Sequence, residues 1–167
     1  NIDGNLTGIA NEGLITTTDD PRNGTVYANA EANNYTIDNR GLIDVGEGNT
    51  GDAISLELGE QVTGSLLNSG KVQGRGTPNN STPASAVRLF RGEDVEEVAS
   101  FNGNIENLGT LASEVGAAIT IQEGVALNGS IINDGTLEGG IDELGQFAID
   151  ASQAADSVRV VSNGSIN

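Results

Sequence analysis

The chain has 167 residues and a formal net charge of −17, with 24 acidic residues against 7 basic ones. It contains no Cys, His, Met or Trp, which excludes a disulfide framework, a thiol nucleophile, an imidazole base and a Cys/His zinc site. The negative charge repels phosphate backbones, so we expect no nucleic-acid partner.

The hydropathy of the chain argues against direct membrane insertion. No apolar run approaches the roughly 20 residues that a membrane helix requires, and no basic start followed by an apolar core marks a signal peptide. The first residue is Asn1 rather than Met. We therefore expect residues 1–167 to form a single segment of a longer protein.

An internal repeat runs along the chain and is aligned by one glycine in each copy. Each copy has an aliphatic residue four positions before the glycine, an Asn two positions before it, and a second aliphatic residue two positions after it. The glycines are Gly13, Gly41, Gly70, Gly109 and Gly135, and the asparagines are Asn11, Asn39, Asn68, Asn107 and Asn133. A sixth copy is expected to begin at Gly164-Ser165-Ile166 and to end with the chain.

The repeated columns predict a structural Asn ladder. The residue just before each repeat glycine varies, so it is expected to face outward, whereas the aliphatic residues are expected to face inward. Asn tolerates a left-handed backbone, and its side-chain amide can both donate and accept hydrogen bonds. We therefore predict that the five asparagines stack along one axis, with the glycine completing each bend.

The spacing of the copies predicts two insertions. Successive repeat glycines are 28, 29, 39 and 26 residues apart. The long third step includes a loop-forming stretch rich in Pro, Asn, Ser and Thr near residues 75–85, and a second addition near residues 93–100. We expect both to project from the outer surface.

Alternating apolar residues predict a third strand in each coil. The pattern is clear at residues 53–56 and 118–121, and weaker at residues 86–89 and 157–160. The fold class expected is all-β: a parallel β-solenoid of about six coils with three short strands each. Uncapped terminal coils would expose strand edges, which favours end-to-end self-association.

The phrase G-S-Φ-x-N-x-G-x-Φ-x-G, where Φ is aliphatic, occurs at residues 64–74 and 129–139. It resembles the repeats of autotransporter passengers and haemagglutinin-like adhesins. The resemblance covers nearly the whole chain and implies a right-handed parallel β-helix in a bacterial secreted or cell-surface protein. The lack of cysteine agrees with that extracellular location.

Grouped acidic residues are candidate catalytic or calcium sites, because parallel β-helices also include polysaccharide lyases and hydrolases. Adjacent carboxylates occur at residues 19–20, 93–94, 96–97 and 142–143. Neighbours on a strand point to opposite faces, so these pairs are interpreted as solvated charges.

One repeated position places two carboxylates in a single column. Asp44 and Glu138 both lie three residues after their repeat glycine, but Gln73 and Ala112 occupy that position in the copies between them. The column therefore supplies no catalytic pair. We assign no catalytic or cofactor-binding residue and no metal ligand, and expect at most weak or non-specific calcium binding.

The function expected is a non-enzymatic structural or adhesive module that could contact a host surface, matrix or glycan ligand. The alternative is a carbohydrate-active enzyme or carbohydrate-binding fragment on the same fold. A groove with converging carboxylates, or a calcium site, would favour the alternative.

Overall fold

The computed structural model describes residues 8–17, 24–29, 34–76, 84–142 and 145–167. These residues form strands and turns, and none of them belongs to an α-helix. Accordingly, no helix in the described part of the chain is long and apolar enough to cross a membrane.

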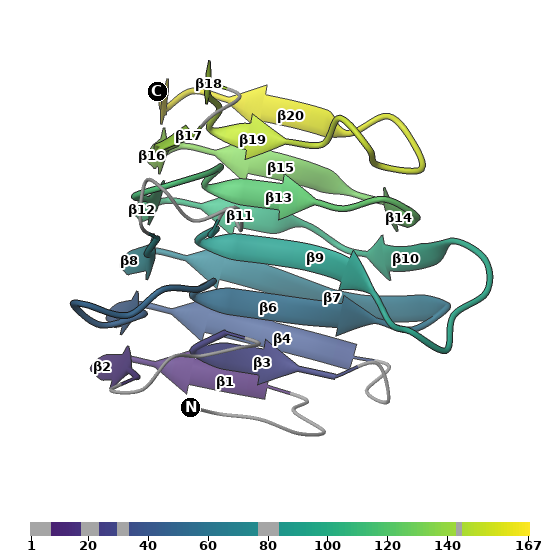
Figure 1. Ribbon diagram of the computed structural model, residues 1–167, viewed down its shortest axis with the longest axis horizontal. Coiled ribbons are helices and arrows are strands. Elements are labelled where there is room, and N and C mark those ends of the chain that lie inside the picture. Colours follow the sequence, from purple (N-terminus) through teal and green to yellow (C-terminus); the bar gives the residue numbers. More distant parts are fainter. Residues whose placement is uncertain (1–7, 18–23, 30–33, 77–83, 143–144) are drawn as a thin grey trace.

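The coils stack along one axis, from the N-terminal coil at the bottom of Figure 1 to the C-terminal coil at the top, and their strands form three parallel sheets. The first sheet contains β1 (Gly8–Asn11), β4 (Asn34–Asn39), β7 (Gln61–Asn68), β11 (Ile105–Asn107), β15 (Ser130–Asn133) and β20 (Arg159–Ser162), with β10 (Ala99–Asn102) and β14 (Val125–Leu127) beside this path. The second contains β2 (Leu14–Thr16), β5 (Leu42–Asp44), β8 (Lys71–Gly74), β12 (Thr110–Ser113), β16 (Thr136–Glu138) and β21 (Ser165–Ile166). The third contains β3 (Val26–Ala28), β6 (Ile54–Leu58), β9 (Val87–Arg91), β13 (Ile119–Ile121) and β19 (Ile149–Asp150).

The predicted β-solenoid is therefore confirmed, with about 5 turns. One antiparallel pair, β17 (Ile141–Asp142) with β18 (Gly145–Gln146), lies beside the stack near its C-terminal end. Every other strand pair in the described ranges is parallel and joins one coil to the next.

The core consists of aliphatic columns that face the axis from all three sheets. In the first sheet Ile37, Leu66 and Ile105 pair in register and are at most 2% exposed. A side chain of this kind stabilises the fold by about 1.5–3 kcal/mol when it is fully buried. Ile9, in the first described coil, is only partly buried, and among the described residues its strand pairs with β4 alone.

The five asparagines of the repeat lie in one column inside the stack. The Nδ2 atom of each donates to Oδ1 of the next, at 2.8 Å from Asn11 to Asn39, 2.7 Å to Asn68, 2.8 Å to Asn107 and 2.8 Å to Asn133. The last four are 0% exposed. Each Asn also accepts, through its main-chain carbonyl, two N–H groups of the next coil. The ladder thus joins neighbouring coils through both side chain and backbone.

The repeat glycines are required by close approach rather than by backbone conformation. A Cβ added to Gly70 would lie 2.0 Å from the carbonyl oxygen of Gly41, and one added to Gly109 would lie 2.0 Å from that of Gly70. Left-handed backbone was expected at this turn, but no described non-glycine residue has a positive φ, and the described glycines that do are not the repeat glycines. Parallel stacking leaves no room for a side chain at this corner of the coil.

The sixth copy is aligned differently from the prediction. Ser165 pairs with Thr136 and Ser162 pairs with Asn133, so Gly164 is the repeat glycine and Ser162 occupies the Asn column. Ser162 Oγ accepts from Asn133 Nδ2 at 3.1 Å and ends the ladder. The prediction was wrong because Gly-Ser-aliphatic also begins other copies, and the Asn that fixes the alignment is absent here.

The predicted third strand at residues 157–160 was also wrong. β20 pairs with β15 in the first sheet, whereas β19 supplies the third-sheet strand through the pairing of Ile149 with Ile119. Alternation with period two is the same in all three sheets, so it indicates a strand without identifying its sheet.

The long step of the repeat lies between β7 and β11, where the paired asparagines are 39 residues apart. Residues 92–98 form a loop that projects between β9 and β10 (Figure 1), while residues 99 and 100 already belong to β10. Most of the other predicted insertion, residues 77–83, lies outside the described residues.

Candidate functional site

The outer face of the second sheet has one repeated column in which long polar side chains flank a short one. Gln73, Ala112 and Glu138 pair in register across β8, β12 and β16. Adjacent strands are about 4.8 Å apart, so the Cα atoms of Gln73 and Glu138 lie about 10 Å apart with only a methyl group between them. The missing side chain leaves a depression one strand wide.

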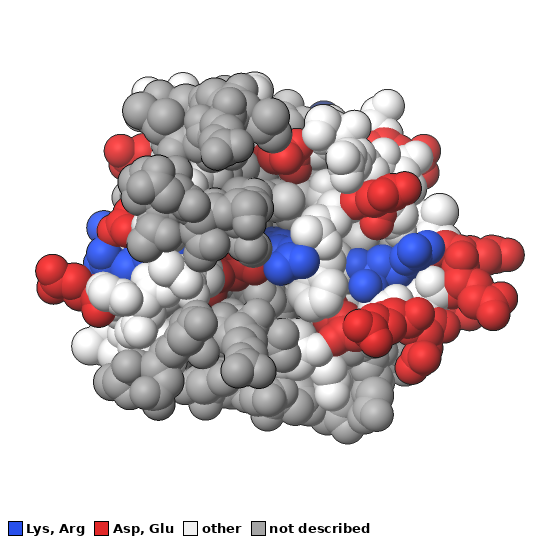
Figure 2. Space-filling view, viewed as in Figure 1, with Lys and Arg blue, Asp and Glu red and all other residues white. Residues whose placement is uncertain are grey.

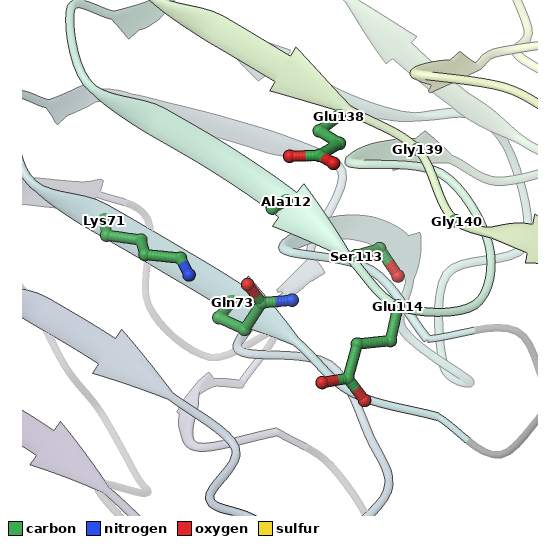
Figure 3. Close-up of a pocket in the computed structure, with 8 residues that line it drawn as sticks. All are labelled: Lys71, Gln73, Ala112, Ser113, Glu114, Glu138, Gly139 and Gly140. Atoms are coloured by element: carbon green, nitrogen blue, oxygen red, sulfur yellow. The ribbon is translucent and has the colours of Figure 1, made fainter. Parts of the chain in front are cut away.

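This depression is a hollow of about 610 Å³, shown in Figure 3. Its lining side chains are Lys71, Gln73, Ala112, Ser113, Glu114 and Glu138, and two glycines lie at its border. We refer to it below as the hollow.

Gln73 supplies a buried polar group to the hollow. Gln73 is only 8% exposed, and its Nε2 donates to the carbonyl oxygen of Gly74 at 3.0 Å. Its Oε1 accepts no hydrogen bond from the described residues, although it is not sealed from solvent. Figure 3 shows the amide at the centre of the group, between Lys71 and Glu114. An acceptor in this position can be satisfied by a ligand.

An ion-pair network borders the hollow on the side of β5 and β8. Arg75 contacts Asp44 through Nε at 2.7 Å and through Nη2 at 3.1 Å, and it also pairs with Glu114. Hydrogen bonding to Asp44 is the main cause of a raised pKa at Arg75. This network holds Glu114 in place and occupies one of the two carboxylates that line the hollow.

The remaining charged groups of the hollow have no ion-pair partner among the described residues. Lys71 and Glu138 are exposed and come from strands on either side of β12. In Figure 3 the carboxylates of Glu114 and Glu138 lie apart and do not point toward each other. The hollow therefore presents donors and acceptors around a small apolar floor, without a facing pair of carboxyl groups.

The carboxylates singled out in the sequence do not converge on a common site. Asp44 and Glu138 share a column but lie three strands apart, about 14 Å, and Asp44 points to Arg75. The four acidic residues at positions 93, 94, 96 and 97 are exposed on the loop after β9, at the right edge of Figure 2, where acidic side chains gather. Residues 19–20 and 143 lie outside the described part of the chain.

No group of three or more acidic, His or Cys side chains among the described residues is arranged to hold a metal ion. Weak or non-specific calcium binding stays a prediction.

Sequence reasoning missed a polar cluster on the outside of the third sheet. Asp52 is 6% exposed, accepts from the Ser85 amide at 2.7 Å and pairs with Arg88 at 3.3 Å. Burial raises the pKa of Asp52, although the charge of Arg88 opposes that shift. Arg88 also lies 4.7 Å from the centre of the Phe90 ring. These contacts couple neighbouring coils from the outside.

The hollow could have been found from the sequence by a different criterion. The column of Asp44, Gln73, Ala112 and Glu138 supplies no two facing carboxylates, and its informative feature is the alanine between long polar residues.

Comparison of the chain with protein-family models, with curated proteins and with solved structures finds no match. The affiliation with autotransporter passengers or haemagglutinin-like adhesins therefore stays a prediction.

Proposed function

We propose that this chain is a non-enzymatic structural or adhesive segment of a bacterial secreted or cell-surface protein. The observation that supports the proposal is the unbroken Asn ladder, which runs from Asn11 to Asn133 with Nδ2 to Oδ1 distances of 2.7–2.8 Å. Coils that are linked by side-chain and backbone hydrogen bonds in every turn form a stiff rod. A stiff rod suits a segment that spaces or presents a binding surface.

The competing function is a carbohydrate-active enzyme, and the hollow is the reason to consider it. Glycoside hydrolysis by the usual mechanism needs two carboxyl groups that flank the scissile bond. Glu114 forms an ion pair with Arg75. Glu138 lies on the other side of Ser113, and its carboxylate does not face that of Glu114 (Figure 3). This arrangement favours binding over cleavage.

The proposal is tested by measuring retention and catalysis with the same protein. Beads coated with the chain are passed over surfaces that carry a neutral polysaccharide, a fibrous matrix protein or albumin. Solutions of neutral and uronate-containing polysaccharides are assayed in parallel for new reducing ends and for unsaturated products.

We expect retention on the polysaccharide or the matrix protein above the albumin background, with no product. Product formation that is lost in Glu138→Gln but retained in Glu123→Gln would identify an enzyme and overturn the proposal. Glu123→Gln is the matched control because it also removes one carboxylate, outside the hollow. Absence of both retention and product would restrict the proposal to a purely structural role.

A further inference from the structure

We infer that the hollow is a binding site for a neutral, hydroxyl-rich ligand, a saccharide, held between Lys71 and Glu138 over the methyl group of Ala112. The inference deepens the adhesive role proposed above and rests on it. It assigns a ligand class and a location to that role.

The first step of the argument is the chemistry of the lining. Lys71 offers only donors, while the Glu138 carboxylate and Gln73 Oε1 offer only acceptors. A hydroxyl group can accept from an ammonium group and donate to a carboxylate at the same time. A ligand with several hydroxyl groups on one face can therefore satisfy all three side chains.

The second step is the charge of the site. An anionic ligand would meet two carboxylates in the hollow and a chain whose formal net charge is −17. A cationic ligand would be attracted by the net charge of the chain, but in the hollow it would meet the ammonium group of Lys71. An uncharged polyol avoids both costs.

The third step is the shape and the floor of the hollow. A volume of about 610 Å³ is within the range of small-molecule sites, but the floor is the small, nearly buried side chain of Ala112. No aromatic side chain is among the described residues that line it. Without a stacking platform the site depends on hydrogen bonds, which exchange with those to water, so we expect weak binding with a Kd of about 1 mM.

The experiment titrates the isotope-labelled chain with cellohexaose, xylohexaose, mannohexaose and maltohexaose, and follows the backbone amide signals by NMR. We expect at least one of these neutral oligosaccharides to shift signals of β8, β12 and β16. An uronate oligomer of similar length should bind at least tenfold more weakly than the best neutral one.

Two variants locate the site, each with a control. Ala112→Leu fills the hollow and should weaken binding at least tenfold, whereas Ala10→Leu makes the same change at an exposed position of β1. Glu138→Gln should also weaken binding at least tenfold, whereas Glu123→Gln removes one exposed carboxylate elsewhere. Because Glu138→Gln changes no packing volume, it tests the site even if Ala112→Leu fails to fold.

The inference is overturned if none of the four oligosaccharides binds, if the shifted signals lie outside these strands, or if both folded variants bind as the original chain does. Bead retention separates this failure from failure of the proposed function. Retention on a matrix protein without saccharide binding would refute the hollow as a glycan site and leave an adhesive role in place.

Discussion

Replacing Asn107 with Ala removes the amide at the middle of the ladder. Its Oδ1 accepts from Asn68 Nδ2 at 2.8 Å, and its Nδ2 donates to Asn133 Oδ1 at 2.8 Å and to the Thr136 carbonyl at 2.9 Å. Asn68 Nδ2 keeps a bond to the Thr110 carbonyl at 3.1 Å, so the main loss falls on Asn133 Oδ1, which is left without a ladder donor.

The expected cost follows from these contacts. Each lost hydrogen bond contributes about 1 kcal/mol net, and a buried acceptor left unsatisfied costs about 1–3 kcal/mol. We therefore expect Asn107→Ala to lower the free energy of unfolding by about 3 kcal/mol. Urea unfolding followed by far-ultraviolet circular dichroism measures this change. If the coils unfold in separate steps, the free energy of unfolding would depend less steeply on urea concentration.

A surface Asn provides the matched control. Asn128 Nδ2 donates to Asn102 Oδ1 at 3.0 Å across the same kind of coil boundary, but this pair is exposed. Water can replace that bond, so Asn128→Ala should change stability by no more than about 0.5 kcal/mol. If Asn107→Ala costs no more than Asn128→Ala, the buried ladder does not hold the coils together and the reasoning fails.

Three further predictions concern packing and charge. Gly70→Ala should lower the free energy of unfolding by about 3 kcal/mol or more, because its Cβ would lie 2.0 Å from a backbone carbonyl oxygen. Gly13→Ala, whose Cβ would have nothing within 4 Å, should change it by about 1 kcal/mol at most. Equal shifts of the thermal unfolding midpoint in the two variants would refute the close-approach argument. Leu111→Ala should cost about 2–5 kcal/mol from a fully buried site, against about 0.5 kcal/mol for Leu108→Ala at 54% exposure, and urea midpoints compare the two. Burial raises the pKa of Asp52 above 3.8, so the folded chain binds this proton more tightly than the unfolded one. The free energy of unfolding of the original chain minus that of Asp52→Asn should therefore increase as the pH falls through the raised pKa toward 3.8. A decrease of this quantity on acidification would contradict the direction of the shift.

The inward-facing half of each coil could be predicted because packing leaves little choice there. Aliphatic residues such as Ile37 and Leu66 must face the axis, Asn68 must reach the next Asn, and Gly70 must leave space for a carbonyl. These constraints recur in each of the five aligned copies, so the sequence shows them in register. Where one constraint is relaxed, as at Ser162, the alignment is lost and the prediction fails.

The candidate site could not be predicted in the same way because it depends on which coils are neighbours. Arg75 and Glu114 are 39 residues apart in the sequence, and their ion pair exists because the third step of the repeat brings β8 beside β12. Asp52 and Arg88, which are 36 positions apart in the sequence, meet because β6 pairs with β9. Contacts of this kind require the register of specific outward-facing residues, which vary from copy to copy.

The separation of the two sides of each strand has a consequence for function. Leu111 is fully buried in the core, whereas the next residue, Ala112, faces outward and forms the floor of the hollow. Since successive residues of a strand point to opposite faces, a change at Ala112 can reshape the hollow without entering the core. The stack therefore tolerates variation in its outward columns at little cost in stability. In this chain the hollow arises from the absence of a long side chain at one outward position. The neighbouring coils, joined by the Asn ladder, hold the framework around it rigid.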